Sequence, residues 1–443
     1  MDEVVDPVDG RAGDYRPRTP TGAALVQRRP LRYHAAPMAA PASRFLHGAS
    51  GTLALLTALN LLNYLDRYLL AGIVAPLQQS LGASQTEIGF LTSAFLLVYM
   101  VAAPAFGLAA RRASRPLLLA AGIFVWSAAT LASGFVHTLL QLLLLRALVG
   151  IGEAAYSTLG PALIAGHYTP QRRASALSIF YAAIPIGTAL SYIASGMLSQ
   201  HWGWRSVFIA GGVPGLLLAF LCLRLREPPD ASEQESAVPP SKGARAAALR
   251  TVLSSADFRS ATIGLTAFTF AFGALAVWMP HYLTTVRGWS AVDASASFGI
   301  IIVAAGLLGT LGGGAAARAL GGGSRACLML CGTCMLAATP LTAAALYCTD
   351  TVLVMTVLFL AATLAFASQG PVNAVLVNAV PADLRAFAVG ANVLAIHAFG
   401  DVPSPVIIGR IADSSWGWEW AMALIPAAML LSALAWLPLW GRR

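Results

Sequence analysis

Four charged residues lie inside long apolar stretches of this chain. Asp66 and Arg67 stand side by side in "NYLDRYLLAG", within a run from Ser50 to Leu77 that holds no other charge. Arg146 and Glu153 lie two helical turns apart in "RALVGIGEAAYS", so a helix would present both on one face. A buried carboxylate favours its neutral form, whereas a neighbouring arginine favours its charged form. Residues of these types in this pattern therefore suit the uptake and release of protons.

The cost of burying these charges excludes contact with lipid, because each charge at the bilayer centre costs about 2.5–3.5 kcal/mol. The four must face a cavity or one another. One interpretation is a permanent ion-pair network that only pins two helices together, although desolvation offsets most of its Coulomb energy. The other is a protonation switch, in which Asp66 binds the proton and Arg67, Arg146 and Glu153 exchange partners. Because arginine stays charged, the two arginines also suit an anionic head group.

A second candidate pair is His397 and Asp401, four residues apart in "HAFGDVPSP". Pro403 and Pro405 follow directly, and they must break or bend a helix there. A single histidine in a membrane helix is more often a hydrogen-bonded structural group. The aspartate one turn away keeps a proton relay open as the alternative.

The body of a substrate would contact aromatic and polar side chains on helices that line a central cavity. We name candidates on this basis, although ordinary helix packing explains each of them equally well. The candidate substrate-binding residues are Tyr64, Tyr68, Tyr156, Ser157, Phe180, Tyr181, Trp278, Gln369, Asn373 and His397.

The chain as a whole has the composition of an integral membrane protein. Its 443 residues are 57% hydrophobic and 11% charged, with a mean hydropathy of +0.70, whereas soluble domains carry about a quarter charged residues. Stretches of about 20 apolar residues, each enough to cross the hydrocarbon layer, recur along it. We predict twelve multi-pass spans, approximately at residues 50–77, 88–109, 117–136, 138–166, 174–199, 206–223, 260–286, 294–317, 326–347, 351–379, 386–409 and 420–440.

A polar stretch divides the spans into two groups of six. We predict a disordered cytoplasmic tail at 1–44, a six-helix bundle at 45–226, a cytoplasmic linker at 227–257 and a second bundle at 258–443. The groups echo each other, since "WGWRSVF" in the first matches "WGWEWAM" in the second. Duplicated six-helix units are typical of secondary transporters. The predicted fold is therefore an all-α integral membrane protein with twelve transmembrane helices in two pseudo-symmetric bundles.

The net charge of +9 is explained by topology rather than by nucleic acid. Most of the 28 Lys and Arg residues fall on the tail, alternate loops and the C-terminus. The positive-inside rule then places both termini in the cytoplasm. A single lysine among these basic residues indicates a GC-rich bacterial genome, and hence a bacterial inner membrane.

Three strings resemble motifs of enzymes or metal centres, but the residues around each do not suit such a site. Cys327, Cys331 and Cys334 have a spacing that can hold an iron–sulfur cluster, but they lie on an apolar helix without polar partners and read as packing thiols. "GIGEAA" lies in mid-membrane with no strand before it, and "GGGAAARALGGGS" lacks the Lys-Ser/Thr of a phosphate loop. We expect no enzyme, no metal and no cofactor besides the proton as coupling ion.

Four longer strings give the chain a family resemblance. "NYLDRY" (63–68), "RALVGIGEAAYSTLGP" (146–161), "SIFYAAIPIGTALSYIASG" (178–196) and "HAFGDVPSPVIIG" (397–409) resemble the major facilitator superfamily and, within it, the Spinster family. The resemblance implies a proton-coupled secondary transporter that moves lysolipid or sphingoid-type amphiphiles by alternating access and works as a monomer. An organic-anion, sugar-acid or drug carrier of the same superfamily is the alternative, and a lipid receptor that transports nothing is a third.

The chain departs from the superfamily at one loop. The usual string G-x-x-x-D-R-x-x-R contains an aspartate that helps to latch the cytoplasmic side. Arg111 stands at that position here, and Ala317 stands at the equivalent position of the second half. We therefore expect no cytoplasmic latch of the usual form.

Overall fold

The computed structural model describes residues 48–110, 112–227, 242–381 and 384–437. Its regular elements within these ranges are helices, without a strand, which confirms the predicted all-α fold. The predicted tail, residues 228–241 of the predicted linker and Arg111 lie outside the described ranges. The elements are α2 (Ala49–Tyr68), η1 (Leu69–Gly72), α3 (Val74–Leu81), α4 (Gln85–Ala109), α5 (Arg115–Ser133), α6 (Leu139–His167), α7 (Pro170–Trp202), α8 (Trp204–Cys222), α9 (Lys242–Ser254), α10 (Ala256–Thr285), α11 (Ala291–Ala319), α12 (Ser324–Tyr347), α13 (Thr351–Ala367), α14 (Gln369–Asn378), α15 (Arg385–Ile396), η3 (His397–Asp401), α16 (Pro403–Ala412) and α17 (Gly417–Trp436).

Eleven described helical segments are long and apolar enough to cross a membrane. The predicted span that is absent from this set is α2, whose hydropathy is lowered by Asn60, Asn63, Asp66 and Arg67. The first three of these side chains are buried among other helices. The polarity of α2 is therefore turned inward, away from lipid.

The first predicted span, residues 50–77, is not one continuous helix. α2 ends at Tyr68, the 3₁₀ turn η1 follows, and α3 begins at Val74. Asp66 and Arg67 therefore lie in the last turn of α2 rather than in the middle of a longer helix.

The span predicted at 386–409 is interrupted where the prolines indicated. α15 ends at Ile396, and the five residues of η3 form a π-helical turn before Pro403 opens α16. Proline lacks the N–H that an α-helix needs, so a change of hydrogen-bond pattern at this point is expected.

The predicted linker, residues 227–257, contains a helix that the polar composition did not predict. α9 buries Val252, and Arg259 of α10 closes its end, because its Nη1 donates to the carbonyls of Leu253 and Ser254 at 2.7 and 2.8 Å. An arginine at a helix C-terminus satisfies carbonyls that have no partner within the helix.

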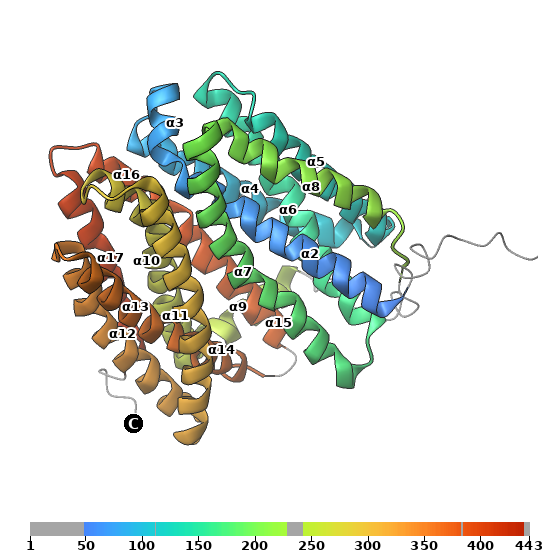
Figure 1. Ribbon diagram of the computed structural model, residues 1–443. Coiled ribbons are helices and arrows are strands. Elements are labelled where there is room, and N and C mark those ends of the chain that lie inside the picture. Colours follow the sequence, from blue (N-terminus) through green and yellow to red (C-terminus); the bar gives the residue numbers. More distant parts are fainter. Residues whose placement is uncertain (1–47, 111, 228–241, 382–383, 438–443) are drawn as a thin grey trace, which may run out of the picture. The chain divides into compact units, whose positions relative to one another are not determined.

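The helices pack in a repeated scheme. Among the N-terminal helices (α2 to α8), α4 and α5 both pack on α6, α5 packs on α8, and α2 packs on α7. Among the C-terminal helices (α10 to α17), α11 and α12 both pack on α13, and α12 packs on α17. Figure 1 shows the two groups side by side, with α4 against α16 and α7 against α11 as the main contacts between them.

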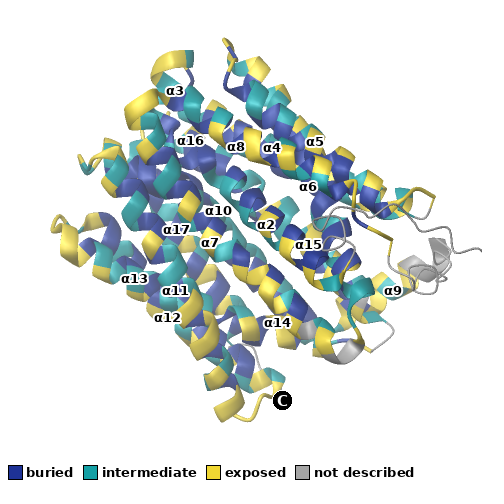
Figure 2. Cartoon of the chain, turned by 45° about the vertical axis from the view of Figure 1, so that its right-hand side comes forward, coloured by how far each residue is buried: buried dark blue, intermediate teal, exposed yellow. Residues whose placement is uncertain are grey.

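Burial follows this packing. Figure 2 shows buried positions where helices meet and exposed positions along the outer faces of α11, α12 and α13. The exposed side chains include large apolar ones such as Leu311 and Val352, which suit contact with lipid. The polar residues that matter for function lie between helices instead.

Candidate proton and substrate site

Asp66 points into the N-terminal helices and is completely buried. Its Oδ2 accepts a 2.8 Å hydrogen bond from Oγ1 of Thr130 on α5. Gly211 of α8 lies against the other oxygen, Oδ1, which has no hydrogen-bond partner among the described residues. Asp66 and its neighbour Arg67 thus have different partners, because successive residues of a helix point about 100° apart.

Arg67 points the other way, toward α4 and α6, and makes a buried ion pair. Its Nη2 lies 2.8 Å from Oε2 of Glu153, and its Nε donates to the same oxygen at 3.2 Å. The arginine side chain is 16% exposed, whereas Glu153 is fully buried. The rings of Tyr64, Phe95 and Tyr99 surround the guanidinium at 5.0, 5.3 and 5.1 Å, distances at which a cation is attracted to an aromatic face.

Arg146 is buried in the same region without an ion pair among the described residues. It lies over the ring of Phe95 at 4.9 Å, and its Nε makes no hydrogen bond there. Asp66 and Glu153 are the carboxylates that interact with it electrostatically. As the helix periodicity predicted, α6 buries both Arg146 and Glu153.

His397 and Asp401 form a pair in the π-helical turn η3. The histidine Nδ1 lies 2.9 Å from both carboxylate oxygens, and the two side chains are 21% and 17% exposed. The imidazole meets the ring of Tyr99 edge-on at 6.4 Å. Tyr99 of α4 therefore contacts both the Arg67 guanidinium and the imidazole of His397.

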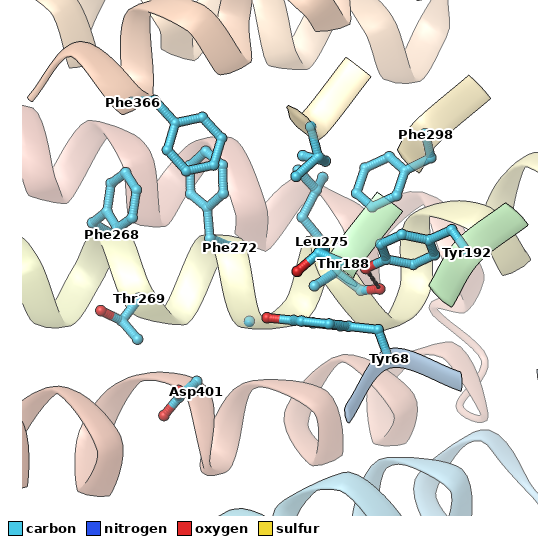
Figure 3. Close-up of a pocket in the computed structure, with 13 residues that line it drawn as sticks. Tyr68, Thr188, Tyr192, Phe268, Thr269, Phe272, Leu275, Phe298, Phe366 and Asp401 are labelled. Atoms are coloured by element: carbon cyan, nitrogen blue, oxygen red, sulfur yellow. Dashed lines mark hydrogen bonds between the residues drawn. The ribbon is translucent and has the colours of Figure 1, made fainter. Parts of the chain in front are cut away.

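Two adjoining cavities lie between the N-terminal and C-terminal helices. The larger, of about 210 Å³, has walls of Phe268, Phe272, Phe298 and Phe366. Figure 3 shows these rings on one side of the cavity, with Tyr68 and Asp401 on the other. The smaller, of about 80 Å³, is lined by Arg67, Tyr68, Leu70, Ala71, Thr92, Phe95, Leu96, Gly273, Ala276, Val277 and Asp401. Tyr68 and Asp401 line both cavities. The larger, aromatic cavity therefore adjoins the smaller one, which Arg67 lines.

The structure distributes the predicted substrate residues over several environments. Tyr68 lines both cavities. Tyr64 touches Arg67, and His397 pairs with Asp401. Of these three, Tyr68 lines the cavities, whereas Tyr64 and His397 contact the lining residues Arg67 and Asp401.

The remaining candidates lie elsewhere. Tyr156 donates to the Leu56 carbonyl at 2.8 Å within the core, and Trp278 donates to the Pro405 carbonyl at 3.0 Å. Ser157 bonds back to Ala154. None of these lines the two cavities. The same holds for Phe180, which is buried, and for Tyr181, which is 47% exposed. It also holds for Gln369 and Asn373, where the Asn373 side chain donates to the Gln369 backbone carbonyl at 2.8 Å.

Sequence reasoning missed the groups that surround the charges. Thr130 is one of three buried polar residues in an apolar span, with Ser127 and Ser133, and this polarity is the signal that could have indicated a buried partner. Phe268 and Phe272, like Phe95 and Tyr99, stand four residues apart and hence on one helix face. That spacing is compatible with any buried face, so it could not single out the cavity.

The comparison with known proteins assigns the family. Residues 56–405 match the sequence profile of the Major Facilitator Superfamily. The chain belongs to this superfamily. Within it the chain is a member of the Spinster family, since it is 36% identical to Protein spinster homolog 1 of Homo sapiens over 385 residues, which cover 81% of this chain and 72% of that protein. It is 32% identical to the Sphingosine-1-phosphate transporter SPNS2 of Mus musculus, with 81% of this chain and 69% of that protein covered.

Solved structures agree on the fold. A bacterial homolog of the human lysosomal transporter Spinster, in an inward-facing and unoccupied conformation, is 22% identical with a TM-score of 0.73, covering 90% of this chain and 95% of that one. A D-xylose–proton symporter is 18% identical with a TM-score of 0.68, covering 87% and 96%. With the family assignment, the chain is a multi-pass membrane transporter of a small-molecule or lipid substrate and not an enzyme.

Proposed function

We propose that this Spinster-family chain is a proton-coupled secondary transporter that moves lysolipid or sphingoid-type amphiphiles by alternating access. The observation that carries the proposal is the division of the four charges. Asp66 is held apart on Thr130, whereas Arg67 is paired with Glu153 at the edge of a cavity. One acid can therefore change its charge without directly breaking the ion pair that faces the cavity.

The proton acts at Oδ1 of Asp66, the oxygen without a hydrogen-bond partner among the described residues. Protonation there removes the charge that attracts Arg146, so this arginine turns toward Glu153. Arg67 then has a weaker hold on Glu153 and is free to bind an anionic group in the cavity. The exchange needs no net movement of charge into lipid, which would be costly.

The substrate class is supported by the shape and lining of the site. An anionic head group fits beside Arg67, because guanidinium groups bind phosphate and carboxylate in bidentate geometry. An apolar chain fits against the four phenylalanines of the larger cavity. The relative named as a sphingosine-1-phosphate transporter carries an amphiphile of this kind. We further propose a monomer in a bacterial inner membrane, with both termini cytoplasmic.

The test is uptake into proteoliposomes across an imposed pH gradient, with a labelled lysolipid and a labelled sugar acid. Wild type is compared with Asp66→Asn and with Glu419→Gln, which removes an exposed carboxylate from α17. We expect gradient-driven lysolipid uptake that Asp66→Asn abolishes and Glu419→Gln leaves unchanged. An Asp66→Asn chain that still concentrates lysolipid would show that the proton acts elsewhere.

The alternative substrate class is a small organic anion, a sugar acid or a drug. The volume of the larger cavity, about 210 Å³, favours it because a long acyl chain does not fit there entirely. Gradient-driven uptake of the sugar acid without lysolipid uptake would establish it. Binding of lysolipid without any flux would instead identify a receptor.

A further inference from the structure

A carboxylate from the C-terminal helices caps a helix of the N-terminal group. Asp413 follows α16, and its Oδ1 accepts from the Gln85 N–H at 2.9 Å. Its Oδ2 accepts from the N–H and the hydroxyl of Thr86 at 2.7 and 2.6 Å. We call these three hydrogen bonds the Asp413 clasp. They join segments that are more than 300 residues apart in the sequence.

The clasp completes the cap of α4. Ser84 and Glu87 already form a capping box, in which the serine hydroxyl takes the Glu87 N–H and the Glu87 carboxylate takes the Ser84 N–H. The N–H groups of Gln85 and Thr86 remain without a partner inside the helix, as in any first turn. Asp413 accepts both, and its charge also complements the positive end of the α4 dipole.

The rest of the α4–α16 contact is built for close approach. Ser93 donates its hydroxyl to the Val402 carbonyl. A methyl group on Gly89 would lie 2.6 Å from the Pro405 oxygen. Small residues let helix backbones meet in this way in membranes. Such contacts separate without leaving a charge behind, whereas opening the clasp leaves the Asp413 carboxylate and the N–H groups of Gln85 and Thr86 without these partners.

α16 links the clasp to the cavity. At its start lies η3, whose Asp401 lines both cavities, and at its end lies Asp413. Trp278 of α10 holds this helix through its hydrogen bond to the Pro405 carbonyl. One short helix therefore connects the ionisable pair in η3 to the clasp.

We infer that Asp413 is a positioning residue that keeps the transporter closed at the end where α4 begins and α16 ends. Alternating access then requires the clasp to open. The inference rests on the alternating access of the proposed function. Asp413 acts through the first turn of α4 and contacts neither the substrate nor the proton. Removing the clasp shifts the population toward the state in which this end is open.

The test measures distances rather than transport. Spin labels are placed at Ser80→Cys on α3 and Ser415→Cys after α16, both exposed, in a full-length chain whose five cysteines are replaced by alanine. Double electron–electron resonance in lipid nanodiscs then compares three variants with the labelled parent. Asp413→Ala removes the clasp, Thr86→Val removes one of its bonds, and Asp350→Ala removes an aspartate that caps α13 of its own group by accepting from the Leu353 N–H at 2.8 Å.

We expect Asp413→Ala to raise the ratio of long to short distances about tenfold, since several hydrogen bonds to a charged group are lost. Thr86→Val should raise it less, and Asp350→Ala should leave it unchanged. Equal distributions for Asp413→Ala and the parent would overturn the inference, and so would an equal shift in Asp350→Ala. Because no substrate or pH gradient is used, either result leaves the transport proposal to its own test.

Discussion

The two groups of helices surround the same cavities with different chemistry. The N-terminal helices contribute Asp66, Arg67, Arg146 and Glu153, which are buried or nearly so and lie among aromatic rings. The C-terminal helices contribute one pair, His397 with Asp401, and an aromatic wall. The helix-pairing scheme is shared by both groups, so the same arrangement of helices carries different residues at the site. We interpret the first group as the ion-coupling side and the second as the side that holds the body of the substrate.

The strongest test of this division is Glu153→Gln. It leaves the Arg67 guanidinium buried without its charge partner, and breaking a buried ion pair costs about 3–5 kcal/mol. We expect lysolipid uptake to fall more than about 100-fold, together with a lower temperature of thermal unfolding.

A double variant separates coupling from simple helix pinning. In Arg67→Met with Glu153→Gln no buried charge is left unpaired at this position, so thermal stability should return toward that of wild type. Uptake should stay lost if the pair takes part in transport. Recovery of both properties would make the pair a structural contact only.

Asp401→Asn should have a smaller effect. It removes the ionic character of the contact with His397, and a hydrogen bond to a charged group is worth about 1.5–3 kcal/mol. We expect pH-driven uptake to fall about tenfold, while exchange of lysolipid at equal pH falls less. A loss as complete as that of Glu153→Gln would break the division, because the C-terminal helices would then share the coupling.

Thr130→Val tests how Asp66 is held. Valine keeps the shape of threonine but removes the hydroxyl that donates to the Asp66 carboxylate. We expect uptake to fall about fivefold at a fixed gradient, consistent with the loss of one hydrogen bond. Ser127→Ala on the same helix is the control, since the Ser127 hydroxyl has no hydrogen-bond partner among the described residues, and it should leave uptake near the wild-type value.

Phe272→Leu should give the smallest change. Phe272 stacks on Phe268 with ring centres 4.3 Å apart, and such pairs are worth about 0.5–1.5 kcal/mol. We expect KM for lysolipid to rise about threefold with kcat unchanged, as measured from initial uptake rates. Phe124→Leu on a half-exposed face of α5 should change neither value. A fall in kcat with unchanged KM would place Phe272 on the coupling side.

The features that could be predicted from the sequence are those that depend on a single helix. Arg146 and Glu153 share a buried face because helix periodicity requires it, and Pro403 marks the interruption of its span because proline lacks an N–H. Eleven of the twelve predicted spans are long and apolar enough to cross a membrane in the part of the chain that the structure describes, although η3 interrupts the one at 386–409. The exception is α2, where inward-facing polar residues lower the hydropathy.

Features that depend on contacts between distant segments could not be predicted. That Thr130 rather than Arg67 would bind Asp66 depends on how α5 lies against α2. Trp278 was expected in the cavity, but the rotation of α10 turns it toward Pro405. The Asp413 clasp belongs to the same class, since nothing local relates Asp413 to Thr86.

The polarity of α2 has a consequence for the order in which the protein is assembled. α2 is the first described span in the chain order, yet its own side chains leave it below the hydropathy of the eleven other described spans. Its buried polar groups find their partners in segments synthesised later, with Asn60 donating to the Phe180 carbonyl at 2.8 Å and Arg67 binding Glu153. The buried polar groups of α2 therefore acquire these partners only when α5, α6 and α7 have been synthesised, so the final placement of α2 depends on helices that come later in the chain.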